Sequence, residues 1–155
     1  MSAKWCATPF ATRSSKHNGW IVDDTKQLRI LIVDDQPYVR RAVRTLLEAQ
    51  KGWAVCGEAS DGIEAIAKTE ELNPDVVVMD MSMPNLNGLE AARAIHQEFP
   101  KSHVLILTLH DLPELAALVE RAGAQGLVLK SDSNRFLISA IEHLGREKTF
   151  FRYKN

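Results

Sequence analysis

The chain alternates short, unbroken apolar runs with longer stretches in which apolar residues recur at helical spacing. Val76, Val77 and Val78 are β-branched and lead without interruption to Asp80. A short continuous apolar run between turn residues is typical of a strand buried on both faces, as in a parallel sheet. Four other stretches have this character, and the five predicted strands are Leu28–Val33, Trp53–Glu58, Val76–Asp80, Val104–Leu107 and Gly126–Leu129.

Amphipathic helices are predicted between and after these strands. Apolar residues spaced at i, i+3, i+4 and i+7 mark the buried face of a helix. In the helix predicted over Gly62–Leu72, we expect Ile63, Ile66 and Ala67 to point inward. Five strands alternating with five helices predict an α/β fold, a parallel sheet with helices on both faces. The other predicted helices carry Val39, Val43, Leu46, Leu47 and Gln50, then Leu89, Ala92, Ile95 and Phe99, then the Ala-rich and Leu-rich stretch Pro113–Arg121, and last Leu137, Ala140, Ile141 and Leu144.

Length and composition are those of one globular domain. The 155 residues are 45% hydrophobic and 25% charged, with a formal net charge of -1. This balance of charge argues against direct binding of nucleic acid by this chain. We expect a poorly ordered N-terminal extension over residues 1–27, a single domain over residues 28–147, and a C-terminal tail or truncated linker over residues 148–155.

Neither a membrane segment nor a disulfide framework is predicted. No run approaches the ~18 apolar residues of a membrane span, and the N-terminus lacks the apolar core of a signal peptide. Cys6 and Cys56 lie in unlike settings, so neither a disulfide nor a zinc site follows from them. We therefore expect a cytoplasmic protein that does not act on a membrane.

Polar residues directly follow the apolar cores of four predicted strands. Parallel strands end at one edge of the sheet, so these side chains should meet there. Each alone has an ordinary structural explanation, such as capping a helix. Three crowded carboxylates, however, raise one another's pKa unless a cation lies among them, and carboxylates with water suit Mg²⁺. These residues are Asp34, Asp35, Asp80, Thr108 and Lys130.

Such a site allows a carboxylate to act as a nucleophile and form an aspartyl phosphate. Thr108 can hydrogen-bond one phosphoryl oxygen, and Lys130 can neutralise another. The motifs are D-D at Asp34 and Asp35, V-V-V-M-D-M-S-M-P-N-L-N-G around Asp80, L-T ending at Thr108 and L-K ending at Lys130. In these motifs, from about residue 28 to residue 147, the chain strongly resembles the receiver domain of bacterial two-component response regulators.

The resemblance implies a flavodoxin-like (CheY-like), doubly wound, five-stranded parallel sheet of strand order 2-1-3-4-5. It also implies that a sensor histidine kinase or a phosphotransfer protein donates a phosphoryl group to Asp80. In the family pattern, Asp35 and Asp80 would bind Mg²⁺ directly, Asp34 would act through water, and the backbone carbonyl of Met81 would complete the protein ligands. Beyond self-phosphorylation and autodephosphorylation, no enzyme activity is implied.

Two positions depart from the family pattern. The family usually carries a switch aromatic where Leu127 stands, and a small residue where Leu109 stands. Ser82 and His110 occupy positions that set the lifetime of the aspartyl phosphate in this family. A degenerate receiver that acts as a phosphorylation-independent protein-interaction module is therefore an alternative. A phosphatase of the haloacid dehalogenase type is a weaker one, because Ser82 replaces its second carboxylate.

The predicted output is a switched protein surface. Strings such as M-P-N-L-N-G-L-E-A-A-R-A-I and G-L-V-L-K-S-D resemble NarL-type receivers, which are parts of transcriptional regulators. We expect no helix-turn-helix output domain within this chain. The surface that would respond to phosphorylation, and that could form a homodimer, consists of the fourth helix, the fifth strand and the fifth helix.

Overall fold

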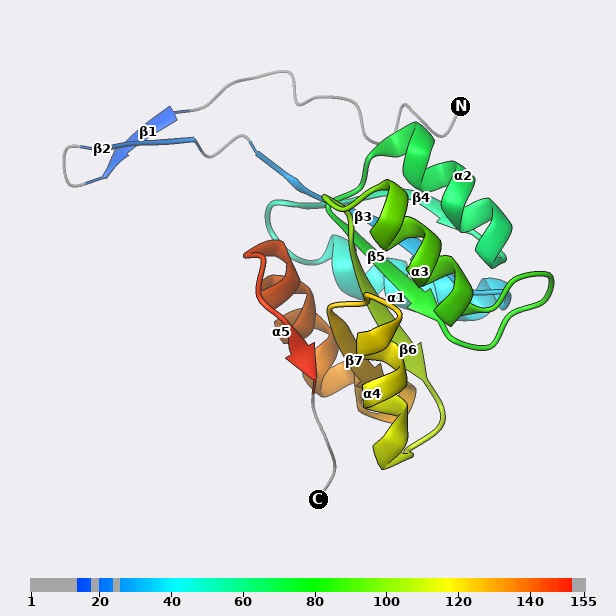
Figure 1. Cartoon of the computed structure of the whole chain (residues 1–155). Coiled ribbons are helices and arrows are strands. Elements are labelled where there is room, and N and C mark those ends of the chain that lie inside the picture. Colours follow the sequence, from blue (N-terminus) through cyan, green and yellow to red (C-terminus); the bar gives the residue numbers. More distant parts are fainter. Residues whose placement is uncertain (1–13, 18–19, 24–25, 152–155) are drawn as a thin grey trace.

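A computed structural model describes residues 14–17, 20–23 and 26–151 (Figure 1). Its main feature is a six-stranded parallel sheet of order β4-β3-β5-β6-β7-β8. The first five strands along this order reproduce the predicted order 2-1-3-4-5, so the predicted flavodoxin-like sheet is confirmed. The strands are β3 (Leu28–Val33), β4 (Trp53–Ala59), β5 (Val76–Asp80), β6 (His103–Thr108), β7 (Gly126–Leu129) and β8 (Phe150–Phe151).

The sixth strand, β8, is a correction to the predicted count of five. Phe150 and Phe151 pair in parallel with Gly126 and Leu127 of β7, and the Phe150 N–H donates to the Gln125 carbonyl at 2.9 Å. Two residues are too few to show a strand period, so the pattern could not predict this element. The strand covers the edge of β7, which would otherwise expose unpaired backbone groups.

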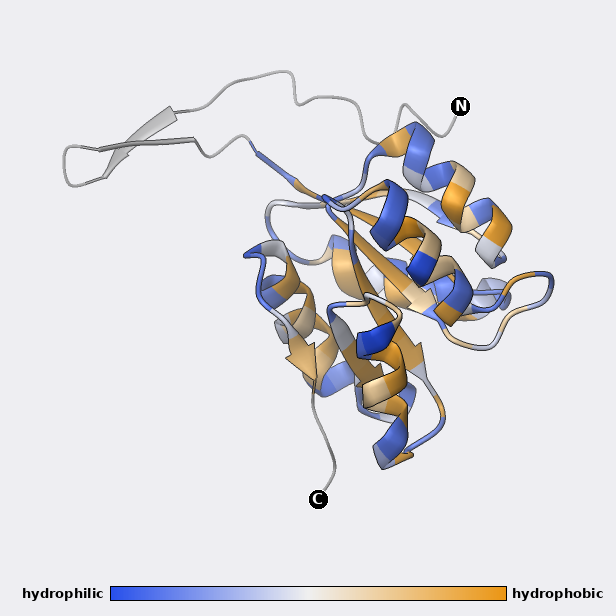
Figure 2. Cartoon of the chain, viewed as in Figure 1, coloured by the Kyte–Doolittle hydropathy of each residue, from blue (hydrophilic) through white to orange (hydrophobic). Residues whose placement is uncertain are grey.

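Helices cover both faces of the sheet. Helices α2, α3 and α4 bury residues in one apolar cluster, and α1 and α5 bury theirs in a second cluster on the opposite face. Figure 2 shows the strands as predominantly apolar, whereas the helices carry both hydrophilic and hydrophobic residues. The helices are α1 (Pro37–Glu48), α2 (Gly62–Leu72), α3 (Gly88–Glu98), α4 (Pro113–Arg121) and α5 (Ser133–Gly145), with a short 3-10 turn, η2 (Lys130–Asp132), before the last.

The central strands are buried on both sides, as their apolar runs predicted. Every residue of β5 is buried. In β3, Ile30 and Ile32 belong to the cluster under α1 and α5, whereas Leu31 and Val33 belong to the opposite cluster. Fully burying one such aliphatic side chain contributes about 1.5–3 kcal/mol. Because these strands are covered on both faces, their polar side chains can reach solvent only at the ends of the strands.

The inward face predicted for α2 was partly wrong, because Ile66 packs against the core but Ala67 is exposed. Ile63 is 59% exposed, and the helix instead buries Ala65, Thr69 and Leu72. Gly62 explains this rotation, because a Cβ on it would lie 2.4 Å from the Leu86 carbonyl oxygen. Small residues let the helix approach closely, and the buried Thr69 hydroxyl donates to the Ala65 carbonyl at 2.7 Å. The predicted α5 stripe, in contrast, is fully buried.

Part of the predicted N-terminal extension forms a small antiparallel sheet. Strands β1 (Ser14–His17) and β2 (Trp20–Asp23) pair with Ser14 opposite Asp23. The sequence pattern did not predict these strands, and residues 1–13 lie outside the described residues. Within the described part of the chain, no helix combines the length and apolar character needed to cross a membrane.

Candidate acidic site at the carboxyl edge of the sheet

Three carboxylates converge where β3 and β5 end. One oxygen each of Asp34, Asp35 and Asp80 lies within 4.8 Å of the others. Asp34 and Asp80 are only 2% and 6% exposed, whereas Asp35 is half-buried. The predicted juxtaposition is therefore present, and two of its three negative charges are largely removed from water.

Asp34 is held by four contacts. Its N–H donates to the Ala59 carbonyl at 3.1 Å, which continues the β3–β4 pairing beyond the strand. Its Oδ1 accepts the Gln36 N–H at 2.9 Å, and its Oδ2 accepts Lys130 Nζ at 2.9 Å. Its carbonyl accepts Arg40 Nη1 at 2.5 Å. The turn between β3 and α1 is thus fixed through both backbone and side chain.

Lys130 supplies the cation of this site. Its Nζ lies 2.9 Å from Oδ2 of Asp34 and 3.1 Å from Oδ1 of Asp80. Burial alone would lower the pKa of Lys130, but the hydrogen bond to Asp34 and the charges of Asp80 and Asp34 outweigh it and raise that pKa. Lys130 therefore remains charged and bridges the ends of β3 and β5.

Asp80 is in a less favourable environment for its charge. Burial raises the pKa of Asp80, and the negative charge of Asp34 raises it further. The charge and hydrogen bond of Lys130, together with the Ser82 N–H, act in the opposite direction without cancelling the rise. An ionised carboxylate held in this way gains from any added positive charge.

Thr108 reaches the same edge through the register of the strands. Asp80 is in register with Leu107, the residue before Thr108, and Thr108 is in register with Leu129, the residue before Lys130. Thr108 is 1% exposed, and its Oγ1 accepts the His110 N–H at 3.1 Å. All the side chains predicted for the site thus stand at the ends of neighbouring strands.

A hollow of about 380 Å³ opens over the acidic site. Its rim includes two exposed apolar side chains, Tyr38 at 68% and Leu109 at 76% exposure, so Leu109 lies at the mouth of the site. A small ligand can therefore reach Asp80 from solvent. The lining residues are Asp35, Gln36, Tyr38, Val39, Asp80, Ser82, Leu109, His110 and Lys130.

The loop after Asp80 is folded tightly against it. The Gly88 N–H donates to the Met81 carbonyl at 2.8 Å, and a Cβ on Gly88 would lie 2.3 Å from the Asp80 carbonyl oxygen. The Asn85 side chain donates to Asp61 Oδ2 at 2.8 Å, which ties the loop to the start of α2. Met81 is absent from the lining of the hollow, whereas Ser82 is part of it.

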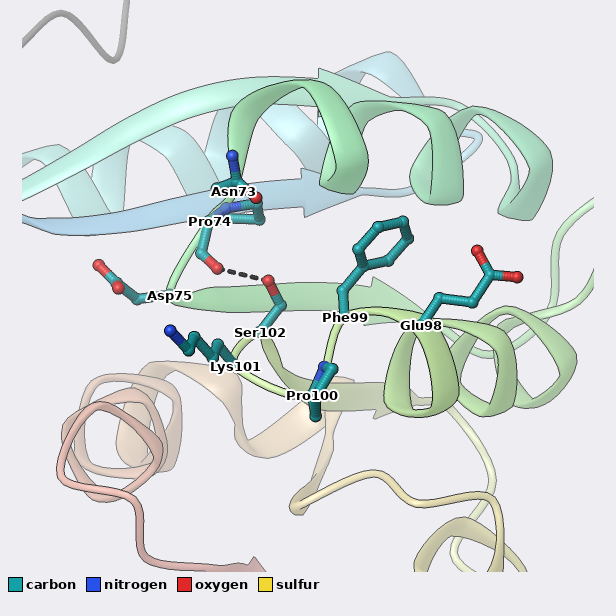
Figure 3. A pocket seen from close by; sticks show the side chains of 8 residues that line it. All are labelled: Asn73, Pro74, Asp75, Glu98, Phe99, Pro100, Lys101 and Ser102. Atoms are coloured by element: carbon teal, nitrogen blue, oxygen red, sulfur yellow. Dashed lines mark hydrogen bonds between the residues drawn. The ribbon is translucent and has the colours of Figure 1, made fainter.

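A second hollow lies at the opposite edge of the sheet, before β5 and β6. Figure 3 shows Asp75, Glu98, Lys101 and Phe99 around it, and the Ser102 hydroxyl donating to the Pro74 carbonyl at 2.6 Å. Its volume is about 470 Å³, larger than that of the hollow over Asp80. Charges of both signs line it, and the carboxylate cluster found in the described residues is at the other edge.

The donor set of the acidic site fits a hard divalent cation. Three carboxylates and main-chain oxygens are the ligands of Mg²⁺ or Ca²⁺, and the three clustered residues include neither thiolate nor imidazole. Both side-chain oxygens of Asp34 already accept hydrogen bonds from the protein. The Met81 carbonyl, which accepts the Gly88 N–H, retains one further acceptor position.

Sequence comparison places these residues in a known family. The profile of the response regulator receiver domain matches residues 30–142. The uncharacterized transcriptional regulatory protein YxjL of Bacillus subtilis (strain 168) is 40% identical over 126 residues, which are 81% of this chain and 58% of that protein. The response regulator UvrY of Escherichia coli (strain K12) is 41% identical over 114 residues, 74% of this chain and 52% of that protein.

Solved structures agree. A two-component response regulator of the LuxR family from Aurantimonas sp. SI85-9A1 superposes with a TM-score of 0.77 at 40% identity, over 80% of this chain and 89% of that one. The response regulator domain of Thermotoga maritima CheB gives a TM-score of 0.73 at 29% identity, over 77% of this chain and 97% of that domain.

The chain spans between half and three-fifths of the length of these curated relatives. The matched region contains four of the five predicted strands in full and the fifth, β3, from Ile30 onward, and the carboxyl ends of four of these strands meet at the acidic site. The resemblance to NarL-type receivers is thereby confirmed. The chain belongs to the family of response regulator receiver domains of two-component systems.

Proposed function

We propose that this receiver takes a phosphoryl group onto Asp80 in a reaction that requires Mg²⁺. The donor would be a phosphohistidine of a sensor histidine kinase or of a phosphotransfer protein. The observation that carries the proposal is the position of Lys130, whose ammonium group lies between Asp34 and Asp80 beneath an open hollow. A cation held there can pair with a phosphoryl oxygen once Asp80 is modified.

The chemistry is a transfer between two nucleophiles. An Asp80 carboxylate oxygen forms a bond to phosphorus as the bond from phosphorus to the histidine nitrogen breaks, and the imidazole keeps the bonding electron pair. Lys130 would neutralise one phosphoryl oxygen, and the Thr108 hydroxyl would donate a hydrogen bond to another. Hydrolysis of the acyl phosphate returns Asp80, so the protein turns over no substrate other than its own modified form.

Four residues would hold the metal. Asp35 and Asp80 would bind Mg²⁺ directly, with the Met81 carbonyl as the third protein ligand. Asp34 would act through a bound water, in line with the hydrogen bonds that its two oxygens already accept. Bound Mg²⁺ supplies positive charge that offsets the repulsion of the carboxylates and of the incoming phosphoryl group. The burial and like charge that raise the pKa of Asp80 support this need.

The output would be a change of the surface formed by α4, β7 and α5. The phosphoryl group of an acyl phosphate carries about 1.5–2 negative charges in place of the single charge of the Asp80 carboxylate, and these charges would draw Thr108 and Lys130 toward it. Lys130 links β7 to α5 through η2, so its movement reaches that surface directly. Homodimerisation there, in a transcriptional regulator like the relatives, is the proposed response. Direct DNA binding by this chain is not part of the proposal.

Intact-mass measurement tests the proposal. The protein is incubated with a small-molecule phosphodonor, with Mg²⁺ or with a chelator, as wild type, as Asp80→Asn and as the control Asp111→Asn in an exposed loop. We expect one phosphoryl adduct in wild type and in the control, only with Mg²⁺, and none in Asp80→Asn. A wild type that stays unmodified would refute the proposal and favour a receiver that acts by protein interaction alone.

A further inference from the structure

We propose that Arg40 is a positioning residue for the acidic site. Together with Glu58, it fixes the peptide group between Asp34 and Asp35, and so sets the geometry in which the carboxylates receive a divalent cation. The inference rests on the proposed function, because it assigns a new residue to that reaction. Arg40 belongs to none of the motifs that identify the site, and it does not line the hollow over Asp80.

The contacts of Arg40 join the site to the neighbouring strand. From the first turns of α1, its Nη1 donates to the Asp34 carbonyl at 2.5 Å, and its Nε donates to Glu58 Oε1 at 2.9 Å. A guanidinium group is planar and rigid, so it can hold two acceptors in a fixed relation. The Arg40 side chain is 18% exposed and that of Glu58 is 31% exposed, so neither is freely solvated.

These contacts close a ring around Asp34. Glu58 directly precedes Ala59, whose carbonyl accepts the Asp34 N–H at 3.1 Å. Arg40 therefore donates a hydrogen bond to the carbonyl of Asp34. The strand β4 binds Arg40 through Glu58 and accepts the N–H of Asp34 through the Ala59 carbonyl. The Asp34 carbonyl belongs to the peptide group that bears the Asp35 N–H. Fixing that group fixes the position of the Asp35 Cα, from which the Asp35 side chain leaves the backbone.

The local charges favour positioning over simple neutralisation. Glu58 is shared by two arginines, because Arg44 Nη2 lies 2.7 Å from Glu58 Oε2 and Arg44 also pairs with Glu48 at 2.8 Å. The carboxylate of Glu58 therefore offsets much of the positive charge that Arg40 would present to the three aspartates. What remains specific to Arg40 is the forked geometry, which a lysine at this position cannot reproduce.

The test compares Arg40→Ala and Arg40→Lys with Arg44→Ala. Arg44→Ala is a matched control, since it removes an arginine from the same helix and from the same Glu58, one turn farther along. The concentration of Mg²⁺ that half-saturates the protein is read from amide chemical shifts at the site. Both Arg40 variants should require about tenfold more Mg²⁺ for half-saturation. Removing a residue that orients a metal ligand typically lowers the metal affinity by at least this factor. The control should stay within about twofold of wild type.

Three results would overturn the inference. They are an unchanged requirement for Mg²⁺ in Arg40→Ala, an equal rise in Arg44→Ala, and full recovery in Arg40→Lys, which would make charge alone sufficient. Urea unfolding of all three variants separates a local effect from a general loss of stability, because both alanine variants lose a partner of Glu58.

A second measurement keeps this inference separate from the proposed function. If the wild type neither binds Mg²⁺ nor accepts a phosphoryl group, the proposed function fails while the positioning role can still be tested. Hydrogen exchange of the Asp34 and Gln36 amides is then measured without metal. It should be faster in Arg40→Ala than in Arg44→Ala, since Arg40 closes the ring around this turn. Equal exchange in the two variants would refute the positioning role.

Discussion

Replacing Asp80 by Asn should stabilise the metal-free protein, although it removes the proposed phosphorylation site. The carboxylates of Asp34 and Asp35 each lie within 4.8 Å of that of Asp80. At an effective dielectric constant of about 20, each pair repels by about 3.5 kcal/mol, whereas Lys130 at 3.1 Å attracts by about 5 kcal/mol. The burial of Asp80, which is the largest cause of its raised pKa, and the repulsion from Asp34 together outweigh the attraction to Lys130.

An asparagine removes the repulsion and the burial cost together, and Lys130 keeps Asp34 as a partner. We therefore expect the free energy of unfolding to rise by about 1–2 kcal/mol in Asp80→Asn, a typical gain when a functional group is traded for stability. Urea denaturation at neutral pH with a chelator present measures the change. The control Asp111→Asn removes an exposed carboxylate and should change stability by no more than about 0.5 kcal/mol.

The sign of the effect can be checked with pH and with Mg²⁺. Because the pKa of Asp80 is raised in the folded protein, the folded state is relatively favoured below the ordinary pKa of 3.8, and this advantage is lost as the pH rises through the folded-state pKa. The gain in Asp80→Asn should therefore shrink as the pH falls toward 3.8. Mg²⁺ should stabilise the wild type more than the variant. A variant less stable than wild type in chelator would refute the reasoning.

Two further predictions concern the elements that support the site. Asp61→Ala should cost about 1 kcal/mol, because Asp61 caps α2 by accepting the Glu64 N–H. That hydrogen bond lowers the pKa of Asp61, so the difference from wild type should vanish in urea titrations as the pH falls through its folded-state pKa, below 3.8. Gly88→Ala should cost about 1–3 kcal/mol in the same assay, since its Cβ would meet the Asp80 carbonyl oxygen; an alanine tolerated without loss would contradict the tight loop.

The sequence was sufficient to predict which polar residues lie together, because the parallel arrangement of the strands brings their carboxyl ends to one edge of the sheet. Asp80 and Thr108 end buried strands, and Asp34 and Lys130 directly follow them. Parallel strands bring such residues to one edge of the sheet whatever the side-chain packing. The strand order 2-1-3-4-5, in contrast, came from the family resemblance. An alternating pattern of strands and helices is compatible with other orders.

What the sequence did not predict depends on close packing or on long side chains. The rotation of α2 follows from the contact of Gly62 with Leu86, whereas its apolar pattern favoured the bulkier Ile63. Arg40 lies outside the apolar stripe predicted for its helix, and no periodicity indicates that its guanidinium group reaches back to Asp34. The spacing of Arg40 six residues after Asp34 is a signal only once the turn is known.

The contact between Lys130 and Asp34 has a consequence for the order of folding. The two residues are 96 positions apart, and β5 and β6 lie between their strands in the sheet. Contacts of such long range form late, since loop closure must precede them. A partly folded chain without β7 would bring the three carboxylates together without their lysine. Divalent cations should therefore relieve the repulsion most in such a state, because Lys130 relieves it only once β7 has joined the sheet.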